Sequence, residues 1–137
     1  MTVRNAVAAD AAAILELWAR ARSASATLSD GEEDIHRLLE RDPGSLLVAE
    51  EDDELVGALI AAWDGWRGNM YRLAVAPDRR RQGIARRLVE AGEERLRGLG
   101  APRVSALAWR EDEPAYGVWQ ATGYDENAGV ARFARNL

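Results

Sequence analysis

One segment of this chain limits its possible folds more than any other. The apolar stretch Tyr71 to Val75 meets Ala76-Pro77, passes through an arginine-rich turn and enters an amphipathic stretch that begins near Gln82. Apolar residues recur at helical spacing from there to Leu99, so that stretch is expected to be a helix. It leads into another apolar stretch, Val104 to Trp109, and a strand, helix, strand unit in one sheet normally makes the two strands parallel. The segment therefore predicts a sheet with a crossover helix.

The remainder of the chain supplies further strands and helices. The pattern predicts strands at Thr2 to Val7, Leu46 to Glu50 and Leu55 to Trp63, and a final hairpin of Tyr124 and Val130 to Ala134. It predicts helices at 10 to 23 and Glu113 to Thr122, with a loop at 23 to 29. A further helix is expected to open at the capping-box pair Ser29 and Glu32 and to end at Asp42-Pro-Gly44. Acidic and glycine-containing turns join the consecutive strands, which is typical of an antiparallel meander. The length predicts one domain, residues 1–137, and periodicity alone predicts a mixed sheet with helices on both faces.

The turn between the strand and the crossover helix has the chemistry of a phosphate site. A helix start leaves several backbone N–H groups without partners, and their summed dipole favours an anion just beyond them. Gly83 has no Cβ, so the backbone there can approach a ligand closely. The nearby guanidinium groups are those of Arg79, Arg80, Arg81, Arg86 and Arg87. The alternative is a basic helix start that only faces water.

Composition excludes several classes of function. The 137 residues contain no cysteine and one histidine, His36, which excludes thiol catalysis, disulfides and histidine-rich metal centres, so no metal is expected. No apolar run approaches the ~18 residues that span a bilayer, and the N-terminus lacks a secretory pattern, so a cytoplasmic protein that does not contact membranes is expected. A net charge of -5 argues against general nucleic-acid binding.

The strand, Ala76-Pro77, the sequence Arg80-x-x-Gly83-x-Ala85 and the following helix together resemble the acetyl-CoA signature of the GNAT family of N-acetyltransferases, Gln/Arg-x-x-Gly-x-Gly/Ala. Gly123-Tyr124 stands where the family usually has Gly-Phe. The resemblance covers nearly the whole chain. It implies an α/β (α+β) acyl-CoA N-acyltransferase fold: a mixed, mostly antiparallel sheet in which two parallel central strands splay apart at a bulge, with helices on both faces. It also implies transfer of an acetyl group from acetyl-CoA to a primary amine, by direct attack in a ternary complex.

The resemblance assigns residues to the acetyl donor. The pantetheine arm would pair with the backbone of Leu73, Ala74 and Val75, whose side chains are ordinary core. The diphosphate would lie against the turn and helix start, formed by Arg80, Arg81, Gln82, Gly83, Ile84, Ala85 and Arg86. Trp119 is also expected to contact the donor near its thioester or to pack in the core. Asp112 stands where the family often carries an asparagine, which leaves that contact open.

The same resemblance leaves the acid and the base open. Many family members use a tyrosine four residues before the Gly-Phe pair as the acid, and here that residue is Trp119, which has no phenolic proton. Tyr116 lies one helical turn earlier and is the candidate acid, although a structural tyrosine is an equal alternative. Asp64 is the first candidate base. Glu111 and Glu33 are further candidates, and each of the three carboxylates could equally be a solvated side chain.

Three functions remain open at this stage. The first is the N-acetyltransferase, with a peptide N-terminus, an amino acid, a polyamine or an antibiotic amine as acceptor. Its oligomeric state is open, and the resemblance is compatible with a homodimer. The second is a coenzyme-A-binding domain of the same fold that senses or scaffolds with little turnover, which the tryptophan at the usual tyrosine position suggests. The third is an unrelated nucleotide-binding module, but the turn lacks both the P-loop ending and the triple-glycine Rossmann spacing.

Overall fold

The computed structural model of the protein describes residues 1–21 and 30–137. The described residues form a five-stranded sheet in the order β1-β2-β3-β4-β5. The strands are β1 (Thr2–Asn5), β2 (Leu46–Glu51), β3 (Glu54–Trp63), β4 (Gly68–Val75) and β5 (Val104–Ala106). Strands β1 to β4 pair antiparallel, and β5 pairs with β4 in parallel. The antiparallel meander and the parallel crossover expected from the sequence are therefore confirmed.

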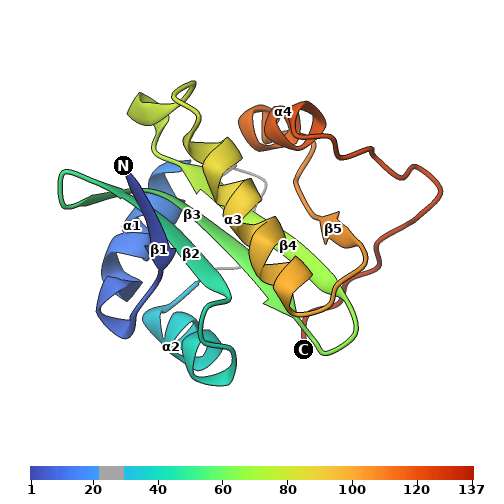
Figure 1. Ribbon diagram of the computed structural model, residues 1–137, viewed down its shortest axis with the longest axis horizontal. Helices are drawn as coiled ribbons and strands as arrows, with labels where there is room; N and C mark the ends of the chain where they lie inside the picture. Colours follow the sequence, from blue (N-terminus) through green and yellow to red (C-terminus); the bar gives the residue numbers. More distant parts are fainter. Residues whose placement is uncertain (22–29) are drawn as a thin grey trace.

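Helices cover both faces of the sheet (Figure 1). The helical elements are η1 (Ala8–Asp10), α1 (Ala11–Ala21), α2 (Glu32–Arg41), η2 (Pro77–Arg79), α3 (Ile84–Gly98) and α4 (Glu113–Ala121). Helices α1 and α2 pack on one face, α3 crosses the other, and α4 lies beyond β4 near the end of β5. The fold expected from the sequence, with helices on both faces of a mixed sheet, is confirmed.

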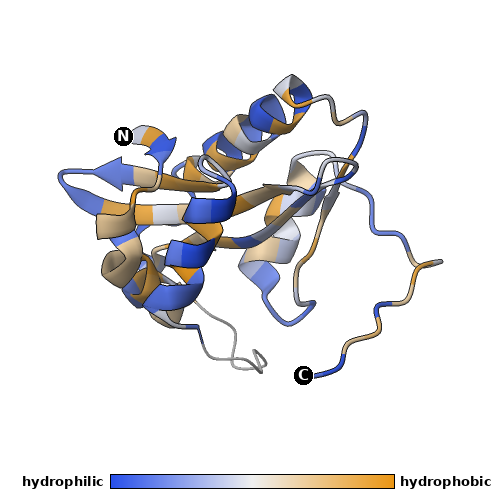
Figure 2. Ribbon diagram, turned by 90° about the horizontal axis from the view of Figure 1, so that it is seen from below, coloured by the Kyte–Doolittle hydropathy of each residue, from blue (hydrophilic) through white to orange (hydrophobic). Residues whose placement is uncertain are grey.

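The sheet separates two hydrophobic cores, because successive strand side chains point to opposite faces. On β3, Ala58 and Ile60 join the core under α1 and α2, whereas Leu59 and Ala61 join the core under α3. Figure 2 shows apolar residues along the sheet and on the helix faces turned toward it. Gly92 lets α3 approach closely, since a Cβ there would lie 2.6 Å from the Met70 sulfur. This packing fixes where α3 begins relative to the end of β4.

The start of α2 differs from the expectation. The helix begins at Glu32, and the carboxylate that closes its first turn is Asp34, whose Oδ2 accepts the Gly31 N–H at 2.9 Å. The Glu32 half of the expected capping box is therefore wrong, because Glu32 is the first helical residue and not the third. Ser29 and the loop expected at 23 to 29 lie outside the described residues. The end of α2 at Arg41, before Asp42-Pro-Gly44, is confirmed.

The expected final hairpin is wrong. Residues 122–137 contain no strand, and β5 ends at Ala106 instead of continuing to Trp109. Tyr124 packs against Trp119, with the ring centroids 5.0 Å apart, and Glu126 pairs with Arg110, so this part of the chain is bonded to α4 and to the β5–α4 loop instead of to the sheet edge. The apolar side chains beyond that point stay exposed, Phe133 to 94%. In Figure 1 this C-terminal segment runs clear of the sheet.

Candidate active site

Strands β4 and β5 are paired for only three residues and then separate. The paired register ends at Met70 and Ala106, followed by a last hydrogen bond from the Leu107 N–H to the Met70 carbonyl at 2.9 Å. Beyond Met70, the edge of β4 that faces β5 has no strand partner among the described residues. This leaves backbone groups of the last residues of β4 open toward a gap in the sheet, which agrees with the expected splay of two parallel strands.

A bulge at Arg72 accompanies this separation. Ala58 is paired with Ala74 and Ile60 with Tyr71, so β4 uses one residue more than β3 over the same length. Arg72 has a left-handed backbone, with φ of 57°, which is costly for a residue with a side chain. Its guanidinium lies over the Trp18 ring, 4.9 Å from the ring centroid, and pairs with Asp30. These contacts join the bulge to α1 and to the residues before α2.

The turn after β4 presents free backbone donors. Gly83 is the N-cap of α3 and has φ of 79°, a conformation that favours glycine. The Arg87 N–H donates to the Gly83 carbonyl at 3.1 Å, which is the first bond of the helix. The N–H groups of residues 84–86 therefore precede the helical ladder and point out of its end. The helix dipole makes this end favourable for an anion, as the sequence predicted.

Helix α4 forms the opposite wall of a cleft. The cleft has a volume of about 620 Å³, within the usual range for ligand sites, and lies between the end of β4, the start of α3 and α4. Asp112 is the N-cap of α4, and its side chain accepts the Ala115 N–H at 3.3 Å. At the α3 end, Arg86 bridges the two walls by donating to the Ala121 carbonyl at 3.3 Å. Ala21, at the end of α1, also lines the cleft.

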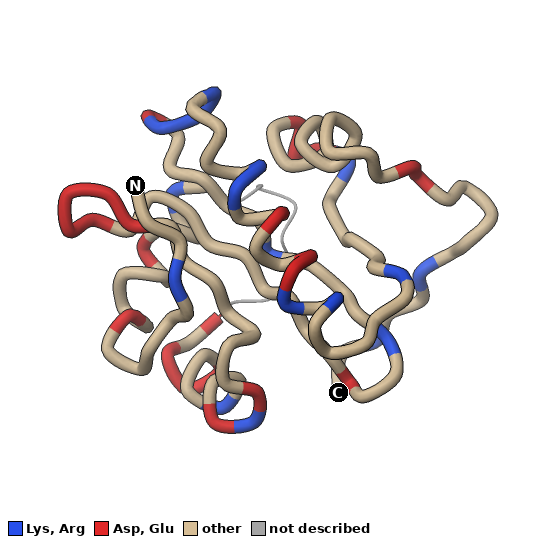
Figure 3. The backbone as a smooth tube through the Cα atoms, viewed as in Figure 1, with Lys and Arg blue, Asp and Glu red and all other residues tan. Residues whose placement is uncertain are grey.

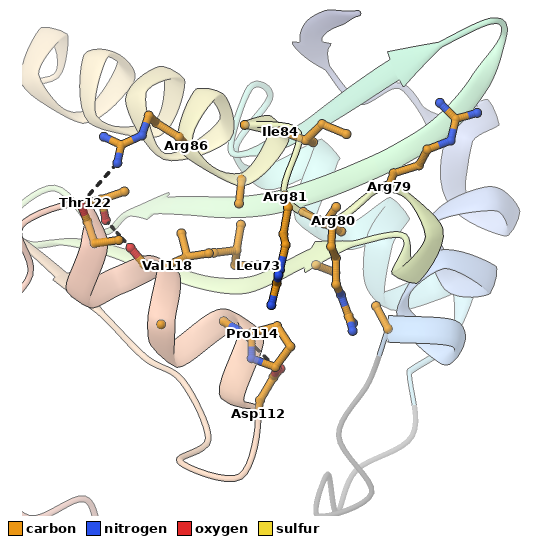
Figure 4. Close-up of a pocket in the computed structure, with 18 of the residues that line it drawn as sticks. Leu73, Arg79, Arg80, Arg81, Ile84, Arg86, Asp112, Pro114, Val118 and Thr122 are labelled. Carbon is orange, nitrogen blue, oxygen red and sulfur yellow. Dashed lines mark hydrogen bonds between the residues drawn. The ribbon is translucent and has the colours of Figure 1, made fainter.

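The arginines around the cleft have different tasks. Arg79 pairs with Glu51 at the end of β2, and its guanidinium points away from the centre of the cleft (Figure 4), so it fixes η2 to the sheet. Arg80 and Arg81 form no hydrogen bond or ion pair within residues 1–21 and 30–137, and they extend toward Pro114 and Asp112 (Figure 4). Figure 3 shows basic residues gathered in this turn, on the same side of the molecule as the acidic β2–β3 turn. Two guanidinium groups are thus available to a ligand at the mouth of the cleft.

Residues 11–124 match the family model of the acetyltransferase (GNAT) family. The chain belongs to this family. An acetyltransferase of Pectobacterium atrosepticum is 34% identical over 116 residues, which cover 85% of this chain and 82% of the relative. The protein is therefore an acetyltransferase, and the resemblance seen in its sequence is confirmed.

Solved structures share the fold of this acetyltransferase. A ribosomal-protein-alanine N-acetyltransferase from Brucella melitensis aligns with a TM-score of 0.76 and 22% identity, over 93% of this chain and 86% of that chain. An aminoglycoside N-acetyltransferase in complex with CoA aligns with a TM-score of 0.79 and 18% identity, over 99% of this chain and 95% of that chain. At these identities the likeness establishes the GNAT fold.

Most residues assigned to the donor in the sequence line the cleft of the acetyltransferase. Lining residues among them are Leu73, Ala74, Val75, Arg80, Arg81, Gly83, Ile84, Ala85 and Arg86. Gln82 is exposed but is not one of the described lining residues. Trp119 is 6% exposed and belongs to the core under α3, so its contact with the donor stays a prediction. The geometry brings the expected phosphate turn and the β4 backbone together in one site.

The sequence reasoning missed the wall that α4 provides. Pro114, Gly117, Val118 and Ala121 line the cleft, whereas Trp119 points into the core. Their spacing of three and four residues marks one face of a helix, and this periodicity was the available signal. Small and apolar residues on that face leave a smooth surface opposite β4.

The candidate acid and base are engaged outside the cleft. The Tyr116 hydroxyl donates to Glu126 at 2.6 Å, and this bond to a carboxylate raises the pKa of Tyr116. Asp64 accepts the N–H groups of Arg67 at 2.6 Å and Trp66 at 2.7 Å in the β3–β4 turn, and these bonds lower its pKa. Neither residue is among the described residues that line the cleft. Their catalytic roles stay predictions.

Two further findings concern the described residues only. No helix among them is both long and apolar enough to cross a membrane. No group of three or more His, Cys, Asp or Glu side chains in residues 1–21 and 30–137 is arranged to hold a metal ion.

Proposed function

We propose that this protein transfers an acetyl group from acetyl-CoA to a primary amine by direct attack within a ternary complex. One observation carries the proposal: a single cleft joins the open β4 edge, the free N–H groups at the start of α3, and two arginines that are unpaired within the described part of the chain. A thioester donor with an amide-containing arm and a diphosphate needs these three features in this order. The function rests on the site and on membership of the GNAT family.

The donor binds along the cleft through backbone groups at both ends. Its diphosphate lies at the N–H groups of residues 84–86, with Arg80 and Arg81 neutralising the charge. Its arm carries secondary amides, which pair with the open edge of Leu73 to Val75 as an added strand would. Helix α4 covers the other side of the arm. Gly83 keeps the turn in the conformation that presents the N–H groups.

The chemistry is one nucleophilic substitution at the thioester carbonyl. The amine nitrogen attacks the carbonyl carbon, the C–N bond forms, the C–S bond breaks, and the amine proton leaves to a base while the thiolate gains a proton. The need for a base depends on the pKa of the acceptor amine, which sets the fraction of the amine that is already neutral. An alkyl amine with a pKa of ~10.4 is only a few parts in ten thousand neutral at pH 7, whereas an α-amino group near ~8 is roughly one tenth neutral.

The proposed acceptor class is based on the names of two structural neighbours. The two structural neighbours are named as acetyltransferases of aminoglycosides and of a ribosomal-protein alanine, both of which present primary amines. We therefore propose a primary amine and test both types. No single acceptor is favoured by the cleft, because the residues that line it belong mainly to the donor side.

Acceptor-dependent thiol release tests the function. The chain contains no cysteine, so free coenzyme A is the only thiol that the assay detects. We expect acetyl-CoA alone to release little thiol, and an aminoglycoside, a peptide with N-terminal alanine or a polyamine to raise the rate at least tenfold. A matching mass gain of one acetyl group on the acceptor is the control. Coenzyme A binding without acceptor-dependent release from a broad amine panel would instead indicate a binding domain.

Two substitutions in the same assay test the candidate base and acid. If Asp64 is the base, Asp64→Asn should lower kcat at pH 7 at least tenfold for an alkyl amine and less for an α-amino group, because more of the α-amino group is already neutral. The turn should persist, because the asparagine oxygen can still accept both turn hydrogen bonds.

If Tyr116 is the acid, Tyr116→Phe should remove the alkaline limb of the kcat profile. The raised pKa keeps Tyr116 protonated until the pH exceeds its ordinary value of 10.0. Unchanged kcat across pH would eliminate the corresponding residue.

A further inference from the structure

Gly117 is a glycine in the middle of a helix without a reason in the packing of the protein. It lies within α4, Glu113–Ala121, where glycine is less favourable than alanine because it loses more backbone freedom on folding. Apart from its two chain neighbours and the backbone of its own helix, a Cβ built on Gly117 would meet no atom of the described residues within 4 Å. Gly92 of α3 is different, because a Cβ there would collide with Met70. The absence of a side chain at Gly117 therefore does not serve contact between helix and sheet.

The open space at Gly117 belongs to the cleft. Gly117 lines it from α4, together with Val118, across from the wall that the end of β4 forms. The β4 edge beyond Met70 has no partner strand among the described residues, so any chain that pairs with it lies between β4 and α4. A side chain at position 117 would extend into the space where such a chain runs. A bare helix backbone leaves that space free.

We propose that Gly117 is a donor-binding position, where the missing side chain makes room for the amide-containing arm of the thioester donor between β4 and α4. This inference rests on the proposed function, because it takes the donor to be acetyl-CoA. It assigns to one residue of α4 the width of the cleft at the place where the donor arm passes. It also explains why the helix keeps a residue that lowers its own stability.

Opposite effects on stability and binding test the inference. We expect Gly117→Ala to raise the Tm of the free protein by roughly 3 °C, because alanine favours the helix and meets no neighbour. Gly117→Leu should also unfold at or above the wild-type temperature. In calorimetric titrations with coenzyme A, we expect Gly117→Leu to weaken binding at least tenfold and Gly117→Ala to weaken it about threefold. A mutation that stabilises the fold and weakens the ligand is not expected for a purely structural position.

Two controls separate the possible causes. Gly98, in the last turn of α3, also faces open space but does not line the cleft, so Gly98→Ala should leave coenzyme A affinity unchanged. Adenosine 3′,5′-bisphosphate carries the nucleotide end of the donor without its arm, so its affinity should be the same for Gly117→Leu and wild type. Equal coenzyme A affinity of wild type and Gly117→Leu, or a lower Tm of Gly117→Ala, would overturn the inference. Failure of the wild type to bind coenzyme A would overturn the proposed function itself.

Discussion

Replacing Arg80 and Arg81 together by alanine is expected to weaken coenzyme A binding about 100-fold. Both side chains are exposed at the mouth of the cleft, and neither has a partner in the described part of the chain that would have to be broken. A hydrogen bond from a charged group contributes about 1.5–3 kcal/mol, and about 1.4 kcal/mol corresponds to a tenfold change in affinity. The fold should be unaffected. Calorimetric titration measures the coenzyme A affinity, and thermal unfolding of the same preparation measures the stability of the fold.

Two single variants make this prediction sharper. Arg37→Ala removes an exposed charge from α2 that is not among the residues lining the cleft, and should leave affinity unchanged. Arg81 has a left-handed backbone with φ of 65°, so Arg81→Gly removes the charge and relieves the conformation at once. We expect Arg81→Gly to bind coenzyme A about tenfold more weakly and to be no less stable than wild type. An affinity unchanged by the double substitution would remove these arginines from the donor site.

Trp119→Ala is expected to produce the largest loss of stability. The side chain is 6% exposed, packs edge-to-face on Tyr124 and belongs to the core beneath α3. Removing a buried tryptophan side chain typically lowers the free energy of unfolding by about 3–5 kcal/mol. Urea unfolding monitored by circular dichroism measures the change. A loss below about 1 kcal/mol would mean that α4 is not anchored through this residue.

Trp119→Phe separates the core role from the predicted donor contact. The indole N–H is buried and has no hydrogen-bond partner among the described residues, so phenylalanine removes an unsatisfied donor while it keeps an aromatic ring. We expect most of the stability to remain, with a loss of about 1 kcal/mol. The coenzyme A affinity of this variant then shows whether the indole contacts the donor. An unchanged affinity would rule out a donor contact through the indole, and a tenfold loss would support one.

The features that the sequence predicted correctly are those that short segments determine. The strand, turn and helix around Gly83 could be predicted because apolar alternation, proline, glycine and helical spacing all occur within twenty residues. The parallel pairing of β4 and β5 followed from the general rule for crossover connections. Because the phosphate turn is itself a local structure, the main part of the candidate site was also predictable.

The remaining features depend on contacts between distant residues. Tyr116 lies one helical turn before Trp119, but its hydroxyl bonds to Glu126 in the segment after α4. The same segment was expected to form a hairpin, since Val130 to Ala134 has the composition of a strand, yet no neighbouring strand pairs with it. Which carboxylate caps a helix or closes a turn, as Asp34 and Asp64 do, depends on single hydrogen bonds that composition does not specify.

Titration of the unaltered protein with coenzyme A tests the central claim most directly. The claim is that the cleft between β4, the start of α3 and α4 binds this carrier through its diphosphate and its arm. We expect saturable heat with coenzyme A and with acetyl-CoA, and weaker binding of ATP, which has phosphates but no arm. Absence of heat with both forms of the carrier, on folded protein that binds ATP, would contradict the account.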